Sequence, residues 1–368
     1  MPYKIHVLQV LGTLDYGGIE SMIMNLYRNI DRNKIQFDFV VHSKQHGVFY
    51  DEVLALGGHV YFCPRYSGTN AIQYRSWWRS FFRKHSEFKI LHSHLRSSAS
   101  LFIPIAKKNG LVTIVHSHST FDGKGFCAYG KRIMEFPLRS QADYLVACSA
   151  EAGKWLFGRD AFERSNYIFL PNGIDAARFA LNQETRSRYR KELGINGKLV
   201  FGHVGRFNEA KNHLFLLDVF AEIHKRNPDT ILLLVGNGQL EKDIRRKSIS
   251  LGLGSSVNMM GNRSDVADIL QAMDVFLFPS KWEGLPMALV EAQAAGLPYI
   301  ISDKITRDVD ITQLVHRLPI NDVKPWADLA LSGLPRSEVT DKIVKAGFDV
   351  KESAIVLARI YEEILEGK

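Results

Sequence analysis

The stretch Ser280–Pro298, SKWEGLPMALVEAQAAGLP, decides how this chain is interpreted. The apolar run DVFLFP at 274–279 precedes it and is typical of a buried strand that ends at a proline. Good helix formers follow Pro286 until Gly296, so we expect a helix over this range. A strand, a loop and a helix in this order indicate an α/β sheet.

The loop between this strand and this helix is a candidate phosphate site. In an open parallel sheet, ligands bind beyond the carboxyl ends of the strands, and the free N–H groups of a helix start attract phosphate. We therefore expect the backbone around Leu285, Pro286, Met287 and Ala288 to bind the phosphates of a ligand.

Two glutamates bracket this phosphate site, Glu283 in the loop and Glu291 on the expected helix, with seven residues between them. A carboxylate beside a phosphate is electrostatically unfavourable unless it accepts hydrogen bonds from sugar hydroxyls around that phosphate. The pattern therefore favours a nucleotide-sugar as the ligand. The alternative is a solvated helix with two incidental glutamates, which the strand and the glycine-proline stop around them disfavour.

Composition excludes several classes of protein. The 368 residues suffice for two domains, and no apolar run approaches the roughly 18 residues of a membrane span. The first residues are strand-like rather than a secretion signal, so a cytoplasmic location is expected. The balance of 47 Lys+Arg against 39 Asp+Glu gives a net charge of +8, which favours an anionic partner. No basic tail or repeat indicates nucleic acid, and three widely separated cysteines indicate neither disulfides nor zinc.

A second anion site is predicted near the amino terminus. Residues 4–9 form a candidate strand, and Gly17 and Gly18 then lead into a helix with an apolar stripe. The glycines do not fit the G-x-G-x-x-G pattern, so a nicotinamide-dependent enzyme is not supported.

Histidines end two predicted strands, KILHSH at 89–94 and LVTIVHSH at 111–118. At the carboxyl ends of adjacent parallel strands, such side chains point toward the ligand site. The candidates are His94, His116 and His118. No third ligand with metal spacing accompanies them, so no metal site is predicted.

Two cations follow the predicted strand at 199–204. Arg206 and Lys211 lie five residues apart in a strand-to-helix loop, where they can bind one diphosphate and neutralise its charge as it leaves. The alternative is two surface cations on a loop.

The segment 70–88 is predicted to be a helix with Trp77, Trp78, Phe81 and Phe82 among basic residues. Two interpretations stay open. The aromatic face packs on the sheet, as expected of a crossover helix, or it contacts a membrane surface.

Together these motifs resemble the retaining glycosyltransferases of family 4 (group 1), which have the GT-B fold. The resemblance rests on the E-x7-E pair, the double glycine and the segment PNGID at 171–175. It implies two Rossmann-like domains with parallel sheets that face a cleft. These are an acceptor-side domain over 1–171, to which 346–368 cross back as a helix, and a donor domain over 172–345.

The resemblance also implies roles for the candidate residues. Glu283 would contact the transferred sugar, as would a histidine that His118 matches best, with His116 and His94 as second choices. Glu291 would bind the ribose, and Arg206 and Lys211 the diphosphate. The backbone of Gly17 and Gly18 would approach the donor, and Asn262 and Arg263 would lie near the base of its nucleotide. The family generally works without a metal or other cofactor, and UDP is its commonest nucleotide.

The segments ISDKIT and QFDFVVH resemble bacterial enzymes that build exopolysaccharide or capsule. This likeness implies a lipid-linked acceptor and peripheral association with the cytoplasmic membrane face. The alternatives are a nucleotide-sugar 2-epimerase on the same fold and a non-catalytic binding module. The intact E-x7-E pair and the two cations disfavour both.

Overall fold

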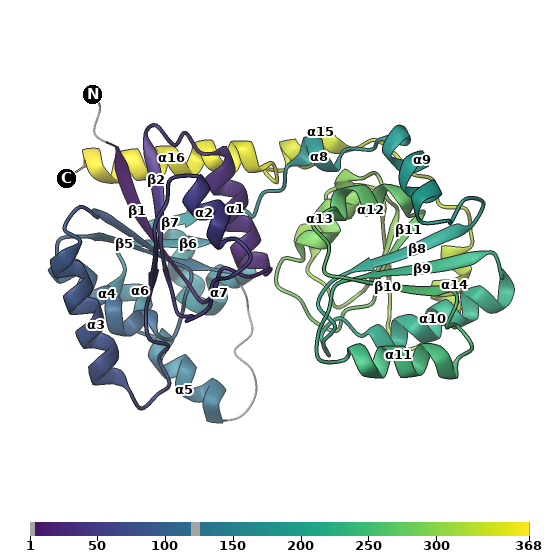
Figure 1. The fold of residues 1–368 in the computed structure, drawn as a ribbon, viewed down its shortest axis with the longest axis horizontal. Coiled ribbons are helices and arrows are strands. Elements are labelled where there is room, and N and C mark those ends of the chain that lie inside the picture. Colours follow the sequence, from purple (N-terminus) through teal and green to yellow (C-terminus); the bar gives the residue numbers. More distant parts are fainter. Residues whose placement is uncertain (1–3, 119–125, 368) are drawn as a thin grey trace. The chain divides into compact units, whose positions relative to one another are not determined.

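The structure is a computed structural model that describes residues 4–118 and 126–367, without the side chains of 126–128. It divides into two compact units, which are described separately (Figure 1). The first unit comprises Met1–Gly173 with Asp349–Lys368, and the second comprises Ile174–Phe348.

The first unit is built on a seven-stranded parallel sheet in the order β3-β2-β1-β4-β5-β6-β7. Its strands are β1 (Ile5–Leu11), β2 (Ile35–Val41), β3 (Val60–Phe62), β4 (Ile90–Ser93), β5 (Val112–Ser117), β6 (Tyr144–Ala147) and β7 (Tyr167–Phe169). Its helices are α1 (Gly18–Asn29), α2 (Tyr50–Ala55), α3 (Ala71–Lys84), α4 (Ala99–Lys108), α5 (Phe126–Glu135), α6 (Leu138–Gln141), α7 (Ala150–Phe157), the 3-10 turn η1 (Arg159–Glu163) and α16 (Val350–Glu366).

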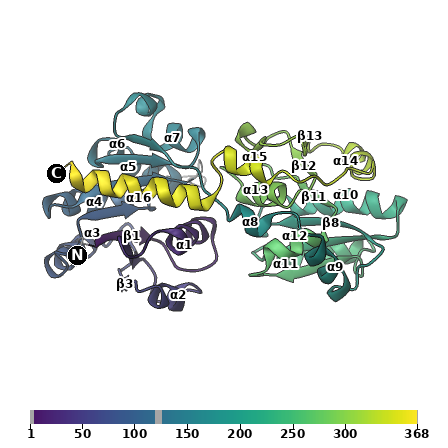
Figure 2. The ribbon, with the colours of Figure 1, turned by 90° about the horizontal axis from the view of Figure 1, so that it is seen from above.

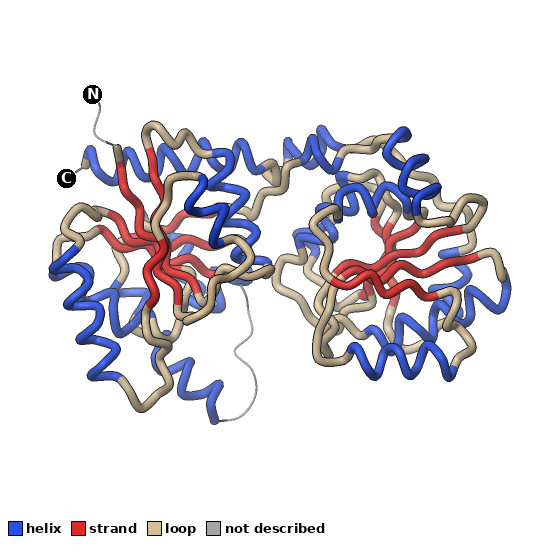
Figure 3. Tube along the Cα trace, in the orientation of Figure 1, coloured by secondary structure: helices blue, strands red, loops and turns tan. Residues whose placement is uncertain are grey.

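Both faces of this sheet are buried, so its strands are apolar on both sides. Successive strand residues alternate between two hydrophobic clusters. One cluster contains Val7 and Ile114 with side chains of α1 and α16, and the other contains Leu8 and Val115 with side chains of α3 and α4. Figure 3 shows helices on both sides of the strands.

The last helix, α16, belongs to the core of the first unit. Leu357, Tyr361 and Ile364 are buried in the same cluster as α1. The Tyr361 hydroxyl lies 2.7 Å from His92 Nδ1 and accepts a 3.2 Å hydrogen bond from Gln9 Nε2. Figure 2 shows α16 running along this unit. The predicted return of the C-terminal helix to the first domain is therefore confirmed.

The second unit has a six-stranded parallel sheet in the order β10-β9-β8-β11-β12-β13. Its strands are β8 (Leu199–Val204), β9 (Thr230–Val235), β10 (Val257–Gly261), β11 (Val275–Phe278), β12 (Tyr299–Ser302) and β13 (Val315–Leu318). Its helices are α8 (Ala176–Phe179), α9 (Gln183–Glu192), α10 (His213–Arg226), α11 (Glu241–Ser250), α12 (Val266–Ala272), α13 (Met287–Ala294), η2 (Arg307–Val309), α14 (Lys324–Ala330) and α15 (Thr340–Lys345).

In each sheet, the first three strands follow one another toward one edge, and the later strands follow one another from the first strand toward the other edge. The reversal lies between β1 and β4 in the first unit and between β8 and β11 in the second. Loops leave such a point in opposite directions, and ligands of open α/β sheets bind there. The prediction of two Rossmann-like parallel-sheet domains is confirmed, and these two points are where the candidate site residues should gather.

The aromatic face of α3 packs inside the first unit. Trp78 and Phe82 are buried, and the Trp78 ring stacks on Phe102 of α4 at 4.5 Å between centroids. This confirms the core interpretation for these side chains and leaves only Trp77 partly buried. Within the described part of the chain, no helix is long and apolar enough to cross a membrane.

We expect Trp78→Ala to lower the free energy of unfolding by about 3–5 kcal/mol, because it empties a fully buried site. The neighbouring change Trp77→Ala should cost clearly less, since that ring is only partly buried. Urea unfolding followed by circular dichroism measures both. An equal loss of unfolding free energy in the two variants would contradict this packing. A Trp78→Ala protein that is as stable as the wild type but no longer sediments with anionic liposomes would contradict it as well.

Candidate functional site

Two loops of the second unit lie side by side at the reversal point. One follows β8 and leads to α10, and the other follows β11 and leads to α13. The Lys281 N–H donates to the Ala210 carbonyl at 2.8 Å, and the Asn212 side-chain amide donates to the Pro279 carbonyl at 3.2 Å. The fold thus brings together the two sequence segments that were predicted to bind a nucleotide-sugar.

An ion pair joins these loops. Lys211 Nζ lies 2.8 Å from Glu283 Oε1, and each side chain is only 14% exposed. The ammonium group also lies 4.5 Å from the centroid of the Phe278 ring. These contacts hold the Lys211 ammonium group at the carboxyl ends of β8 and β11. An anion that binds there would pair with this ammonium group alongside Glu283.

Glu291 lies in the middle of α13, and burial raises its pKa to about 7 against the opposing charge of Lys211. Near neutral pH this carboxyl is therefore divided between its protonated and ionised forms. It can both donate a hydrogen bond to a ligand hydroxyl and accept one from it.

The start of α13 is open to a ligand. Pro286 occupies the N-cap position, and no side chain caps the helix. Met287 and Ala288 are its first two residues, and the first-turn N–H groups of a helix have no partner within the helix. This geometry suits a phosphate group, as the sequence predicted.

Glycines let the neighbouring backbones approach each other. A Cβ at Gly205 would lie 2.9 Å from Lys211 Cε, so a side chain there would displace the lysine. Gly236 has a φ of +129° and packs on the Gly205 carbonyl. Arg206, the second predicted cation, is exposed and, among the described residues, makes no ion pair. Its charge is thus free for a ligand.

The predicted base-binding residues have different surroundings. Asn262 is exposed. Arg263 donates from Nε and Nη2 to the Asp265 carboxylate at 2.7 and 2.6 Å, and this bond raises the arginine pKa. The Arg263 side chain is therefore engaged beside the start of α12.

The predicted glycine site of the first unit lies at the start of α1. Gly17 is its N-cap, and a carboxylate oxygen of Glu20 takes the place where a Cβ of Gly17 would be. A Cβ on Gly18 would meet no atom within 4 Å. An anion at this helix start must therefore compete with Glu20.

His118 ends a chain of hydrogen bonds that starts at Gln9. Gln9 Nε2 donates to Tyr361, so Gln9 Oε1 accepts from His94 Nε2 at 2.9 Å. His94 Nδ1 then accepts from His118 Nε2 at 2.8 Å. This order of donors leaves a lone pair on His118 Nδ1, which is buried and has no hydrogen-bond partner among the described residues. Burial and the charge of Arg96 lower the His118 pKa to about 3, so the ring is neutral and can accept from a hydroxyl.

The family models match both units of this chain. "Glycosyltransferase Family 4" covers residues 16–178, and "Glycosyl transferases group 1" covers residues 185–311. EpsF of Bacillus subtilis, named as a glycosyltransferase, is 35% identical over 368 residues, with 96% of each chain covered. The chain belongs to the group 1 glycosyltransferases. It is thus an enzyme of the hexosyltransferase type.

Two further proteins are similar to this glycosyltransferase. The Escherichia coli UDP-Gal:alpha-D-GlcNAc-diphosphoundecaprenol alpha-1,3-galactosyltransferase is 28% identical over 231 residues, which is 60% of this chain and 59% of that one. The crystal structure of Anabaena Alr3699/HepE in complex with UDP-glucose matches with a TM-score of 0.76 at 17% identity. This match covers 99% of this chain and 100% of the Anabaena chain, and it shows that the two proteins share a fold.

The sequence analysis of this glycosyltransferase missed two residues that contact candidate site residues from other strands or helices. Phe278 beneath Lys211 and Tyr361 beside Gln9 were not singled out. The spacing of His92 and His94, two residues apart in a strand, did carry a usable signal, since such residues face the same side of a sheet.

The raised pKa of Glu291 predicts a pH dependence of stability. The folded state keeps a proton up to about pH 7 that the unfolded state loses near pH 4.5, so stability is lost as pH rises between these values. We expect the free energy of unfolding of the wild type to fall relative to Glu291→Gln by roughly 1–3 kcal/mol over this window.

Urea titrations from pH 4 to pH 8 measure this difference, with Glu184→Gln as the matched control. Glu184 is exposed on α9, so its variant should run parallel to the wild type. A difference between wild type and Glu291→Gln that does not vary with pH would show that Glu291 titrates normally.

Proposed function

We propose that this glycosyltransferase moves a sugar from a UDP-sugar to a lipid-linked acceptor in exopolysaccharide or capsule synthesis, with retained configuration. The observation that carries the proposal is the Lys211–Glu283 ion pair beside the uncapped start of α13. UDP-glucose in the Anabaena protein and UDP-Gal in the name of the Escherichia coli relative support UDP as the nucleotide.

The donor diphosphate would be held by positive charge from three sources. Lys211 and Arg206 supply two cations, and the N–H groups at Met287 add the partial charge of a helix start. Donors fixed before reaction stabilise the charge that develops on a leaving diphosphate. We therefore propose a transfer without a metal cofactor. The D-x-D pattern at 308–310 is no metal site in this proposal, since Asp310 pairs with Arg317 at 2.6 Å.

The sugar would react through an oxocarbenium-like state. Glu283 would orient the sugar from the second unit, and Glu291 would bind the ribose hydroxyls. His118 would accept a hydroxyl hydrogen bond at its free Nδ1, in agreement with its neutral ring. NMR of the product anomer tests whether configuration is retained.

A basic groove between α3 and α4 suits the lipid-linked acceptor. It has a volume of about 500 Å³, and its basic lining residues are Arg75, Arg79, Arg83 and Lys108. Leu101, Pro104 and Ile105 add apolar side chains to the lining, and Ser76, Ser100 and Asn109 are its other residues. Phosphate binds to such cations, and the acceptor named for the Escherichia coli relative is a diphosphoundecaprenol. We propose that this groove lies against the cytoplasmic face of the membrane.

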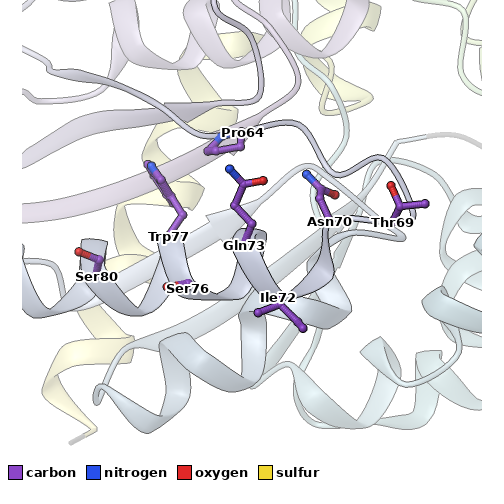
Figure 4. Close-up of a pocket in the computed structure, with 8 residues that line it drawn as sticks. All are labelled: Pro64, Thr69, Asn70, Ile72, Gln73, Ser76, Trp77 and Ser80. Atoms are coloured by element: carbon purple, nitrogen blue, oxygen red, sulfur yellow. The ribbon is translucent and has the colours of Figure 1, made fainter.

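A second hollow lies along α3, and no charged residue lines it (Figure 4). It is lined by Pro64, Thr69, Asn70, Ile72, Gln73, Ser76, Trp77 and Ser80. Since it offers no cation, it does not serve the phosphate of the acceptor.

We expect Lys211→Met to weaken UDP binding by about 10- to 150-fold and uridine binding by less than about twofold, because only the diphosphate meets the ammonium group. Isothermal titration calorimetry measures both ligands. Lys281→Met is the matched control, a lysine of the adjoining loop whose side chain is 39% exposed. Equal losses for UDP and uridine would overturn the diphosphate role of Lys211.

Reversal of charge in the basic groove should affect the acceptor alone. The double change Arg79→Glu with Arg83→Glu should lower kcat/KM for a vesicle-borne lipid diphosphate acceptor by about 10- to 100-fold and leave UDP binding intact. Arg245→Glu with Arg246→Glu makes the same charge change on exposed residues of α11. If both double variants behave alike, the groove has no specific role.

A further inference from the structure

Three buried histidines lie together on the sheet face that α1 and α16 cover. His92, His94 and His116 are 1%, 4% and 1% exposed. His92 lies on β4, His94 directly follows that strand, and His116 lies on the neighbouring β5. One ring nitrogen from each histidine lies within 4.8 Å of those of the other two. We call these residues the histidine cluster.

The histidine cluster contains nitrogens that the described protein atoms do not satisfy. His116 Nδ1 and Nε2 and His92 Nε2 are buried and have no hydrogen-bond partner among the described residues. A buried polar group without a partner costs about 1–3 kcal/mol, so native structures fill such sites with water or an ion.

The chemistry of these rings favours a metal ion. The neutral imidazole binds metals through the ring nitrogen that carries no proton. His92 Nδ1 is bonded to Tyr361 and His94 Nε2 to Gln9. Metal-bound histidines have this arrangement, in which the second nitrogen is held by an outer partner.

We propose that His92, His94 and His116 bind one transition-metal cation of the zinc class. Imidazole ligands select zinc and its neighbours over magnesium or calcium, and three histidines form a common zinc site. Zinc–nitrogen bonds of ~2.0–2.1 Å place tetrahedral ligand atoms about 3.4 Å apart, so the rings need to close by about 1.5 Å at most. Ring rotations supply a shift of this size.

His118 lies within reach of the same ion. Its ring centroid is 3.9 Å from that of His116 and 5.1 Å from that of His94. A cation on His94 Nδ1 would replace the hydrogen bond from His118 Nε2. The inference departs from the sequence-based expectation of no metal. It does not rest on the proposed function, because His92, His94 and His116 have no role in the proposed transfer, and His118 is the one residue of that transfer near the ion.

The test measures metal on the full-length protein, purified without a histidine tag and stripped with a chelator. Zinc sulfate is added, unbound metal is removed by gel filtration, and the metal content is measured by mass spectrometry. We expect about one zinc per chain and a raised melting temperature, because an ion that binds only the folded state stabilises it. Magnesium chloride should give neither result.

Cobalt substitution tests the ligand set without any mutation. Cobalt bound by histidines in a tetrahedral site should give visible d–d bands and no thiolate charge-transfer band. A thiolate band, or the absence of any cobalt uptake, would overturn the proposal.

The variants His116→Ala and His92→Ala should weaken zinc binding by about 100-fold or more. His316→Ala is the matched control, since it removes one partly buried histidine from β13 of the second unit. UDP binding and circular dichroism confirm that each variant is folded. A metal-free wild type, or equal zinc binding by His116→Ala and His316→Ala, would show that the histidine cluster binds no metal.

Discussion

The ion pair between Lys211 and Glu283 is the interaction on which the proposed donor site depends. It joins two loops that start from adjacent strands but are separated by about 70 residues in sequence. Neither charge is fully exposed, so each needs the other while the site holds no ligand. The pair therefore keeps a cation in place at the reversal point of the sheet without an anion bound there. The first unit presents neutral groups at its own strand ends, His118 above all, so the two units contribute different chemistry.

Much of this arrangement was predictable from short sequence segments. The strand at 274–279 and the helix after Pro286 appear as β11 (Val275–Phe278) and α13 (Met287–Ala294). Apolar runs, glycine turns and helix stops are local signals, so they locate elements well. The same signals placed Arg206, Lys211 and Glu283 in loops after strand ends and Glu291 on the helix that follows.

What the sequence could not give was the set of partners. Arg263 is engaged by Asp265, and Glu20 folds back on Gly17, because side chains bind whatever the loop conformation brings near. The burial that shifts the Glu291 pKa also depends on tertiary packing. The histidine cluster was overlooked because its members were counted by spacing along the chain. The relevant distance is set by strand register, since β4 and β5 pair in parallel with His92 opposite Ile114.

The position of α16 determines the order in which the two units can be completed during translation. Residues 349–368 leave the ribosome after all of residues 174–348, yet they belong to the core of the first unit. A nascent first unit therefore waits with an uncovered apolar face, and with Gln9 and His92 lacking their Tyr361 partner, while the second unit already has its whole sequence. The first unit therefore cannot complete its core before the sequence of the second unit has been synthesised.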